Sequence, residues 1–263
     1  MDYLIELENV TLLSENYKIL KNVTISFPAG KCTLILGPSG CGKSTLLKAA
    51  AGILIPDWGR VLIEGKNLVR MSEKELQSFR KKNGFVFQDA ALWANRSLFE
   101  NLSIPLQFHF PDLSRKEIHD RVIKSLEETG MDSQAFLRPA QISAGEQKIV
   151  SLQRALILDP IVLYMDEPTL SIDKKVVGII YDIIRNYKQK NRTLLVVTHD
   201  QDLISWLADY LVILVQGKIV EAGPFDTVKN STDPDVQSVL SSVLAKAASY
   251  DTDILGLLDR EEH

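Results

Sequence analysis

The residues best suited to chemistry form one glycine-rich segment near the start of the chain. It fits the spacing G-x-x-x-x-G-K-[ST] and runs Gly37-Pro38-Ser39-Gly40-Cys41-Gly42-Lys43-Ser44. Glycines let backbone N–H groups turn inward around phosphate oxygens, and the helix that follows adds a partial positive charge at its N-terminus. Lys43 can reach the β- and γ-phosphates, and the Ser44 hydroxyl can ligate Mg²⁺. This P-loop pattern predicts a site for a nucleoside triphosphate.

Two carboxylates close an apolar run at residues 162–165. Asp166 stands where a Walker B acid would help to hold Mg²⁺, and Glu167 can polarise the attacking water. An isolated Asp-Glu pair before Pro168 is also typical of a solvated turn. Because a phosphate-binding loop precedes the pair in this chain, we expect both carboxylates to take part in phosphoryl transfer.

Ser143 and Glu146 form a capping-box pattern at the start of an amphipathic helix. That helix continues through Ile149, Leu152 and Leu156. We expect this structural role whatever the function is. A helix N-terminus with small residues is also a second surface that can bind phosphate.

An α/β domain must position these residues. Beyond the glycine-rich loop, apolar strand-length runs alternate with amphipathic helical segments. The predicted strands are 32–36, 59–64, 85–87, 161–165, 193–197 and 211–215, and the predicted helices are 43–51, 73–81, 174–189 and 200–208. Fully apolar strands between such helices indicate a mainly parallel sheet core, covered on both faces. Alternation in 4–10 and 23–27 predicts an N-terminal antiparallel β part.

The middle of the chain changes character. Residues 90–158 show no strand pattern, while 114–129 has apolar residues at helical spacing. We therefore expect a helical subdomain at about 90–158, inserted in a domain that spans 1–230. Residues 231–263 are expected to form a C-terminal helix and then a polar, mobile tail from 251.

Composition excludes several classes of protein. The chain has 263 residues, 45% hydrophobic and 24% charged, the ordinary balance of a globular protein. A net charge of −4 gives no basic field for nucleic acid. No apolar run approaches the ~18 residues of a membrane span. The start lacks a signal-peptide pattern, and Cys32 and Cys41 cannot form a disulfide framework, so we expect a reducing cytoplasm.

The order of motifs resembles the ATP-binding subunit of ABC (ATP-binding cassette) transporters. Gln88 stands where the family has its Q-loop, and residues 142–146 resemble the family signature, usually Leu-Ser-Gly-Gly-Gln. After the Walker B pair, residues 171–173 resemble the D-loop and 198–200 the H-loop. The match covers about residues 3–225, and its joint order is far more specific than any single motif.

The resemblance implies that two subunits sandwich two ATP molecules head to tail, each site using the P-loop of one subunit and the signature of the other. The nucleotide would then be contacted by the P-loop residues, by Thr45, and by Ser143 and Gly145 of the partner copy. Mg²⁺ contacts fall on Ser44, Gln88 and Asp166. Glu167 would be the general base, with Gln88 near the attacking water and His199 at the γ-phosphate.

The chain departs from the family pattern at three positions. Ala144 replaces the first signature glycine, and Glu146 replaces the glutamine and adds negative charge near phosphate. The aromatic residue that would stack on adenine is replaced by Ser14, with Tyr17 displaced by three positions.

A finer resemblance is to the ATPase of the maintenance-of-lipid-asymmetry (Mla) systems. It rests on residues 87–93, on 97–106, on the absent adenine aromatic and on the segment 233–237. It implies phospholipid transport in a bacterial envelope, with an integral membrane permease and an MCE-domain protein as partners. The chain would then lie on the cytoplasmic face of the inner membrane.

Other functions remain open at this point. The same ATPase could serve a lipoprotein exporter or a solute importer. A soluble ABC machine for ribosomes or DNA usually has two cassettes or a long coiled-coil insertion, and neither is present. A small-molecule P-loop kinase would lack the signature, the D-loop and His199.

The segment 90–110 is unusually apolar. We expect Leu102 and Leu106 to pack the inserted helices onto the core. Trp93 lies five residues beyond Gln88. Because Trp and Phe bury large rigid surfaces at interfaces, Trp93 and Phe99 are predicted to help form the groove that receives the permease.

Overall fold

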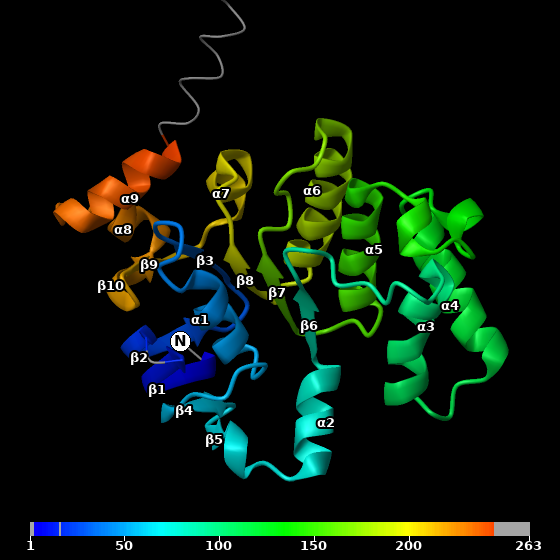
Figure 1. Cartoon of the computed structure of the whole chain (residues 1–263), viewed down its shortest axis with the longest axis horizontal. Helices are drawn as coiled ribbons and strands as arrows, with labels where there is room; N and C mark the ends of the chain where they lie inside the picture. Colours follow the sequence, from blue (N-terminus) through cyan, green and yellow to red (C-terminus); the bar gives the residue numbers. More distant parts are fainter. Residues whose placement is uncertain (1–2, 16, 245–263) are drawn as a thin grey trace, which may run out of the picture.

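The strand that leads into the glycine-rich loop lies inside a six-stranded sheet (Figure 1). The computed structural model describes residues 3–15 and 17–244. The strand order is β10 (Lys218–Pro224), β9 (Tyr210–Val215), β3 (Cys32–Leu36), β8 (Thr193–Val197), β7 (Val162–Asp166) and β6 (Asn83–Val86). All neighbours are parallel except β10 and β9. Every residue of β3, β7 and β8 is buried, which explains their largely apolar sequences.

A second, antiparallel sheet packs beside the first. It contains β2 (Tyr17–Pro28), β1 (Tyr3–Ser14), β4 (Trp58–Ile63) and β5 (Lys66–Asn67), in that order. Helix α1 (Lys43–Ala50) contacts strands of both sheets, and one apolar core fills the space around it. A second core lies between the large sheet and the other helices. The expected fold class, a parallel core with an N-terminal antiparallel part, is confirmed.

Helices occupy the chain between β6 and β7. The structure has no strand from residue 87 to 161, a stretch that it describes completely. The helices there are α3 (Leu98–His109), α4 (Arg115–Glu127) and α5 (Ala144–Leu156), and α5 packs beside α6 (Lys174–Gln189). Each of α3, α4 and α5 begins at a serine with a glutamate three residues later, and both capping-box bonds are present. Leu102 and Leu106 are fully buried in this region.

Three short helices lie in the last part of the described chain. Helix α7 (Gln201–Leu207) connects β8 to β9, and α8 (Phe225–Lys229) and α9 (Pro234–Leu244) follow β10. Helix α9 buries Val236, Val239, Leu240 and Val243. The polar tail predicted from residue 251 lies outside the described residues. None of the helices within 3–15 and 17–244 is long and apolar enough to cross a membrane.

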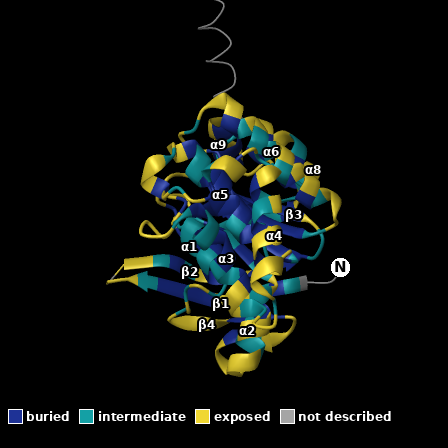
Figure 2. Cartoon of the chain, turned by 90° about the vertical axis from the view of Figure 1, so that its right-hand side faces the viewer, coloured by how far each residue is buried: buried dark blue, intermediate teal, exposed yellow. Residues whose placement is uncertain are grey.

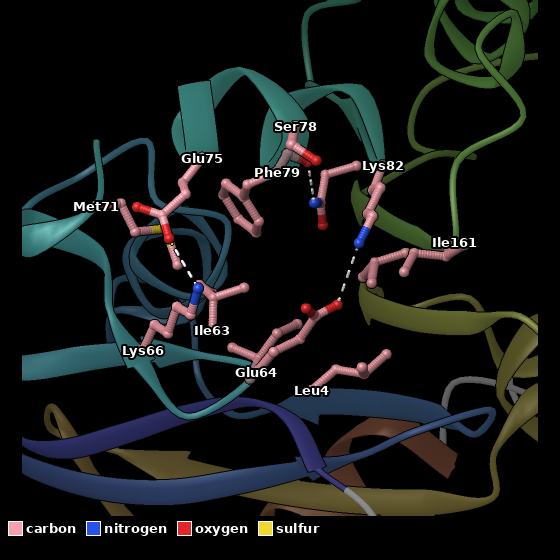
Figure 3. A pocket seen from close by; sticks show the side chains of 13 residues that line it. Leu4, Ile63, Glu64, Lys66, Met71, Glu75, Ser78, Phe79, Lys82 and Ile161 are labelled. Atoms are coloured by element: carbon pink, nitrogen blue, oxygen red, sulfur yellow. Dashed lines mark hydrogen bonds and ion pairs between the residues drawn. The ribbon is translucent and has the colours of Figure 1, made fainter. Parts of the chain in front are cut away.

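Helix α2 (Glu73–Lys81) connects the antiparallel sheet to β6 (Figure 3). Two ion pairs cross the mouth of the pocket beneath it, Lys66 to Glu75 at 2.7 Å and Lys82 to Glu64 at 3.5 Å. All four side chains are largely exposed, so the pairs contribute little to stability. The apolar side chains that line the pocket, including the buried Phe79, hold the helix more strongly than these ion pairs do. Figure 2 shows the exposed outer surfaces of α2 and α4 and the buried interior behind them.

Strand β6 starts and ends earlier than the predicted 85–87. Its second residue is Gly84, which strand propensity disfavours. A Cβ atom there would lie 2.4 Å from the carbonyl oxygen of Ala155 in α5, so only glycine lets this helix approach. The difference arises from tertiary packing that local sequence does not reveal.

The loop after Gln88 has an unusual backbone. Ala90 and Ala91 have φ values of +63° and +46°, a region that L-residues avoid. The guanidinium of Arg154 in α5 donates to both carbonyl oxygens, at 3.2 and 2.9 Å. The bonds from Arg154 therefore hold this loop in a strained conformation.

We expect Ala91→Gly to raise the free energy of unfolding by about 1 kcal/mol, because glycine adopts positive φ without the cost borne by alanine. Ala91 is exposed, so little packing is lost. Chemical denaturation of the purified protein measures the change. Ala208→Gly is the matched control, since its φ of −68° should make that change destabilising. A lower free energy of unfolding in Ala91→Gly would show that the backbone at Ala91 is not strained.

Candidate active site

The glycine-rich loop joins β3 to α1, and close packing or backbone conformation requires glycine at several of its positions. A Cβ atom on Gly37 would lie 2.0 Å from the carbonyl oxygen of Leu214, so β9 leaves no room for a side chain. Gly40 and Gly42 have φ values of +76° and +106°. These conformations favour glycine and let the chain turn tightly before the helix begins. Helix α1 then starts at Lys43 with its N-terminus at the loop.

Lys43 is held across this loop. Its ammonium donates to the carbonyl oxygens of Gly37 at 2.8 Å and Pro38 at 2.9 Å, and only 8% of the residue is exposed. The loop therefore holds a fixed positive charge beside the helix N-terminus, as phosphate binding requires. Cys41 is also buried, and burial raises the pKa of its thiol, so its role here is packing.

The Walker B aspartate meets the loop directly. The Ser44 hydroxyl donates to Oδ1 of Asp166 at 2.9 Å, although 122 positions separate them. Asp166 is the last residue of β7 and is 3% exposed. A hydroxyl and a carboxylate oxygen thus lie side by side, the hard oxygen donors that Mg²⁺ prefers. Among the described residues, no cluster of three His, Cys, Asp or Glu side chains that could hold a metal ion is found.

Glu167 is a buried carboxyl group that faces His199. It is 8% exposed, and burial raises its pKa to about 7. The backbone N–H of His199 donates to Oε2 at 3.3 Å, and Nε2 of the same residue lies 3.5 Å from Oε1. A carboxyl group with a pKa near neutral is suited to accept a proton at working pH.

One open pocket of about 650 Å³ gathers most of the predicted residues. Its lining includes Ser39, Gly40, Gly42, Lys43, Ser44, Thr45, Gln88, Glu167 and His199. Gly37, Pro38 and Asp166 lie directly behind this lining, through the bonds to Lys43 and Ser44. The structure therefore brings the P-loop, the Walker B pair, Gln88 and His199 together on one side of the large sheet.

Ser143 and Gly145 do not line this pocket. Ser143 is the N-cap of α5, and its hydroxyl donates to Oε2 of Glu146 at 2.8 Å. Hydrogen bonds from Ser143 and Gln134 lower the pKa of Glu146. A Cβ atom on Gly145 would lie 3.0 Å from a methyl group of Val176, so packing against α6 favours glycine there. A nucleotide role for Ser143 and Gly145 requires a second copy and stays a prediction.

Tyr17 lies nearer the pocket than its sequence position suggests. The β1–β2 hairpin pairs Tyr17 with Ser14, and both residues line the pocket. The tyrosine is 65% exposed, and the ammonium of Lys21 lies 5.6 Å from its ring centroid. The hairpin pairing therefore places Tyr17 at the pocket beside Ser14, the residue that replaces the expected aromatic. A hairpin that pairs positions 14 and 17 is the signal from which Tyr17 could have been chosen.

Trp93 and Phe99 have different neighbours. Trp93 is 44% exposed, and the guanidinium of Arg154 lies 5.1 Å from its ring centroid. Phe99 is partly buried and stacks against Phe136, with centroids 5.9 Å apart. Sequence reasoning missed Arg154, which contacts both the strained loop and Trp93, because nothing local indicates that long-range contact.

Comparisons with known proteins agree with this geometry. The model of the ABC transporter family matches residues 20–170. The chain is 35% identical to the intermembrane phospholipid transport system ATP-binding protein MlaF of Haemophilus influenzae, covering 88% of this chain and 87% of that protein. It is 34% identical to the probable ribonucleotide transport ATP-binding protein mkl of Mycobacterium leprae, covering 92% and 70%. Among solved structures, the dimeric ATP-binding cassette MJ0796 bound to ADP and Pi gives a TM-score of 0.76 at 30% identity, covering 84% and 98%.

The chain belongs to the ABC transporter family. It is an ATPase subunit of that family, and the resemblance drawn from motif order is confirmed. The likeness to the Mla ATPases is confirmed as well, over about nine-tenths of the chain.

We expect Tyr17→Ala to weaken MgATP binding about tenfold, because stacking of a base on an aromatic ring is worth about 1–3 kcal/mol. Tyr17→Phe keeps the ring and should bind as wild type does. Titration calorimetry with MgATP gives the dissociation constants. Equal affinity in the alanine variant would show that Tyr17 does not stack on the base.

Proposed function

We propose that this chain binds and hydrolyses ATP to drive a membrane transporter for phospholipids in a bacterial envelope. The assignment of phospholipid as the cargo rests on similarity to the phospholipid-transport protein MlaF along nearly the full length of both chains. The mycobacterial relative is named for ribonucleotide transport, which makes ribonucleotides the alternative cargo. A lipoprotein or another solute would leave the ATPase assignment intact.

The site supports hydrolysis by an oriented water. Lys43 and the backbone N–H groups of the P-loop bind the phosphates, and Glu167 accepts the proton of the attacking water. The water oxygen bonds to the γ-phosphorus while the bond from that phosphorus to the β–γ bridging oxygen breaks, releasing ADP and phosphate. His199 contacts Glu167 and would meet the γ-phosphate from the end of β8. Gln88 lines the same pocket and would lie near the water.

Ser44 and Asp166 would hold Mg²⁺, with Gln88 as a further ligand. Their adjacent oxygens fit that ion, since Mg²⁺ commonly binds one or two carboxylates together with substrate phosphates. When bound, Mg²⁺ neutralises charge on the phosphate oxygens. The hydrogen bond between the Ser44 hydroxyl and the Asp166 carboxylate keeps both side chains in place.

A second copy of the chain would complete each site. Ser143 and Gly145 lie at the N-terminus of α5, outside their own pocket, so they would serve the ATP of the partner copy. The dimeric MJ0796 cassette supports this arrangement. A triphosphate between two helix N-termini would hold the copies together until hydrolysis removes that charge. No nucleic acid partner is proposed.

The membrane partner would be an integral permease, with an MCE-domain protein in the same system. The chain would lie on the cytoplasmic face of the inner membrane. Trp93 is our candidate for permease contact, because it is half exposed and Arg154 connects it to the loop after Gln88. Phe99 would contribute to that groove from α3. We propose residues 1–230 as the ATPase domain with about 90–158 as its helical insertion, followed by a C-terminal helix and tail at 231–263.

We expect Glu167→Gln to bind MgATP as wild type does and to hydrolyse it at least a hundredfold more slowly, because general-base catalysis contributes 10²–10⁴-fold. Lys43→Ala should instead weaken binding, since a charge paired with phosphate is lost. Calorimetry and a phosphate-release assay separate the two effects. Near wild-type turnover in Glu167→Gln would show that Glu167 is not the base.

The cargo is tested in the complex purified from native membranes with its permease. We expect ATP hydrolysis to rise several-fold in phospholipid vesicles and not to be stimulated by added ribonucleotides. The Lys43→Ala complex is the control for contaminating ATPases. Stimulation by ribonucleotides or amino acids, with none by phospholipid, would overturn the lipid assignment and leave the ATPase assignment standing.

A further inference from the structure

Lys148 is a buried cation that the proposed reaction does not use. It lies on α5, five residues after the N-cap Ser143, and only 6% of it is exposed. Its ammonium donates to the backbone carbonyl oxygen of Glu167 at 3.1 Å. A buried ammonium costs free energy unless it is hydrogen-bonded or paired, so its position reflects specific partners.

The backbone of Glu167 is held on both sides. Its N–H donates to the carbonyl oxygen of Val197, the last residue of β8, at 2.8 Å. Its carbonyl oxygen accepts from Lys148. Between these two bonds Glu167 has φ +48°, a conformation that costs a non-glycine residue free energy. The two bonds therefore maintain a strained backbone that sets where the carboxyl group points.

Burial lowers the pKa of the Lys148 ammonium, and the carboxyl groups of Asp166, Asp89 and Glu167, in that order, oppose this shift. These acids come from the end of β7 and from the residue after Gln88. Lys148 thus belongs electrostatically to the active site, although it does not line the nucleotide pocket.

We propose that Lys148 is a positioning residue for hydrolysis, which holds the backbone of Glu167 so that its carboxyl group faces His199 and the nucleotide pocket. The proposal rests on the proposed role of Glu167 as base. Because Lys148 and Ser143 share one helix, the segment that would contact the partner's ATP also holds the base of its own site. A shift of α5 on closure of the dimer would therefore be transmitted to Glu167.

The test compares Lys148→Met, which removes the donor, with Lys148→Arg, which keeps charge and donors. We expect kcat of the methionine variant to fall about tenfold or more, because about one hydrogen bond from a charged group is lost. Its Kd for MgATP should stay within about twofold of wild type. The arginine variant should recover most of that turnover. Calorimetry, phosphate release and thermal unfolding are measured on the same full-length preparations.

Gln153→Met is the matched control. Gln153 lies on the same helix, is 4% exposed, and donates to the Thr129 hydroxyl at 2.9 Å, away from the site. It should lose stability like Lys148→Met and keep its kcat. The proposal is overturned if Lys148→Met turns over as wild type does, if Gln153→Met loses as much kcat, or if the arginine variant is as slow as the methionine one. A wild-type chain that does not hydrolyse ATP would instead overturn the proposed function.

Discussion

The burial of three neighbouring parallel strands on both faces is the constraint on which the site depends. Strands β3, β8 and β7 are paired in register, and Val197 of β8 pairs with Ile35 on one side and Asp166 on the other. Their carboxyl ends therefore meet at one edge of the sheet. The P-loop, the Walker B acids and His199 follow those ends, so segments far apart in sequence converge without long connecting loops.

Helix α5 connects this edge to the rest of the molecule. Near its N-terminus are Ser143 and Gly145, Lys148 reaches the backbone of Glu167, and Arg154 holds the loop after Gln88. Gly84 lets the same helix approach β6. A displacement of α5 would therefore act on the base, on the Q-loop and on the contact with a second copy together. This would give a physical route from nucleotide chemistry to the permease contact proposed at Trp93.

Sequence predicted the parts whose chemistry is local. The P-loop glycines, the apolar strands and the capping box of Ser143 and Glu146 depend on near neighbours, so their residue types show their roles. The start of β6 depends on tertiary packing and was predicted two residues too late. The pairing of Tyr17, already named as a nearby aromatic, with Ser14 depends on a hairpin that the sequence analysis did not consider. Lys148 gave no signal at all, because a lysine on a helix usually lies in solvent and only the fold brings Glu167 beside it. The positive φ values of Ala90 and Ala91 were hidden for the same reason.

In the proposed dimer, each ATP site would combine the P-loop of one copy with the signature of the other. The direct measurement is ATP hydrolysis by purified mixed dimers carrying Lys43→Ala and Ser143→Arg. With the two changes on different copies, both defects fall in one composite site, and we expect partial activity from the other. With both changes on one copy and a wild-type partner, each site carries one defect and activity should be lost. The reverse pattern, with activity only when both changes share a copy, would contradict the account.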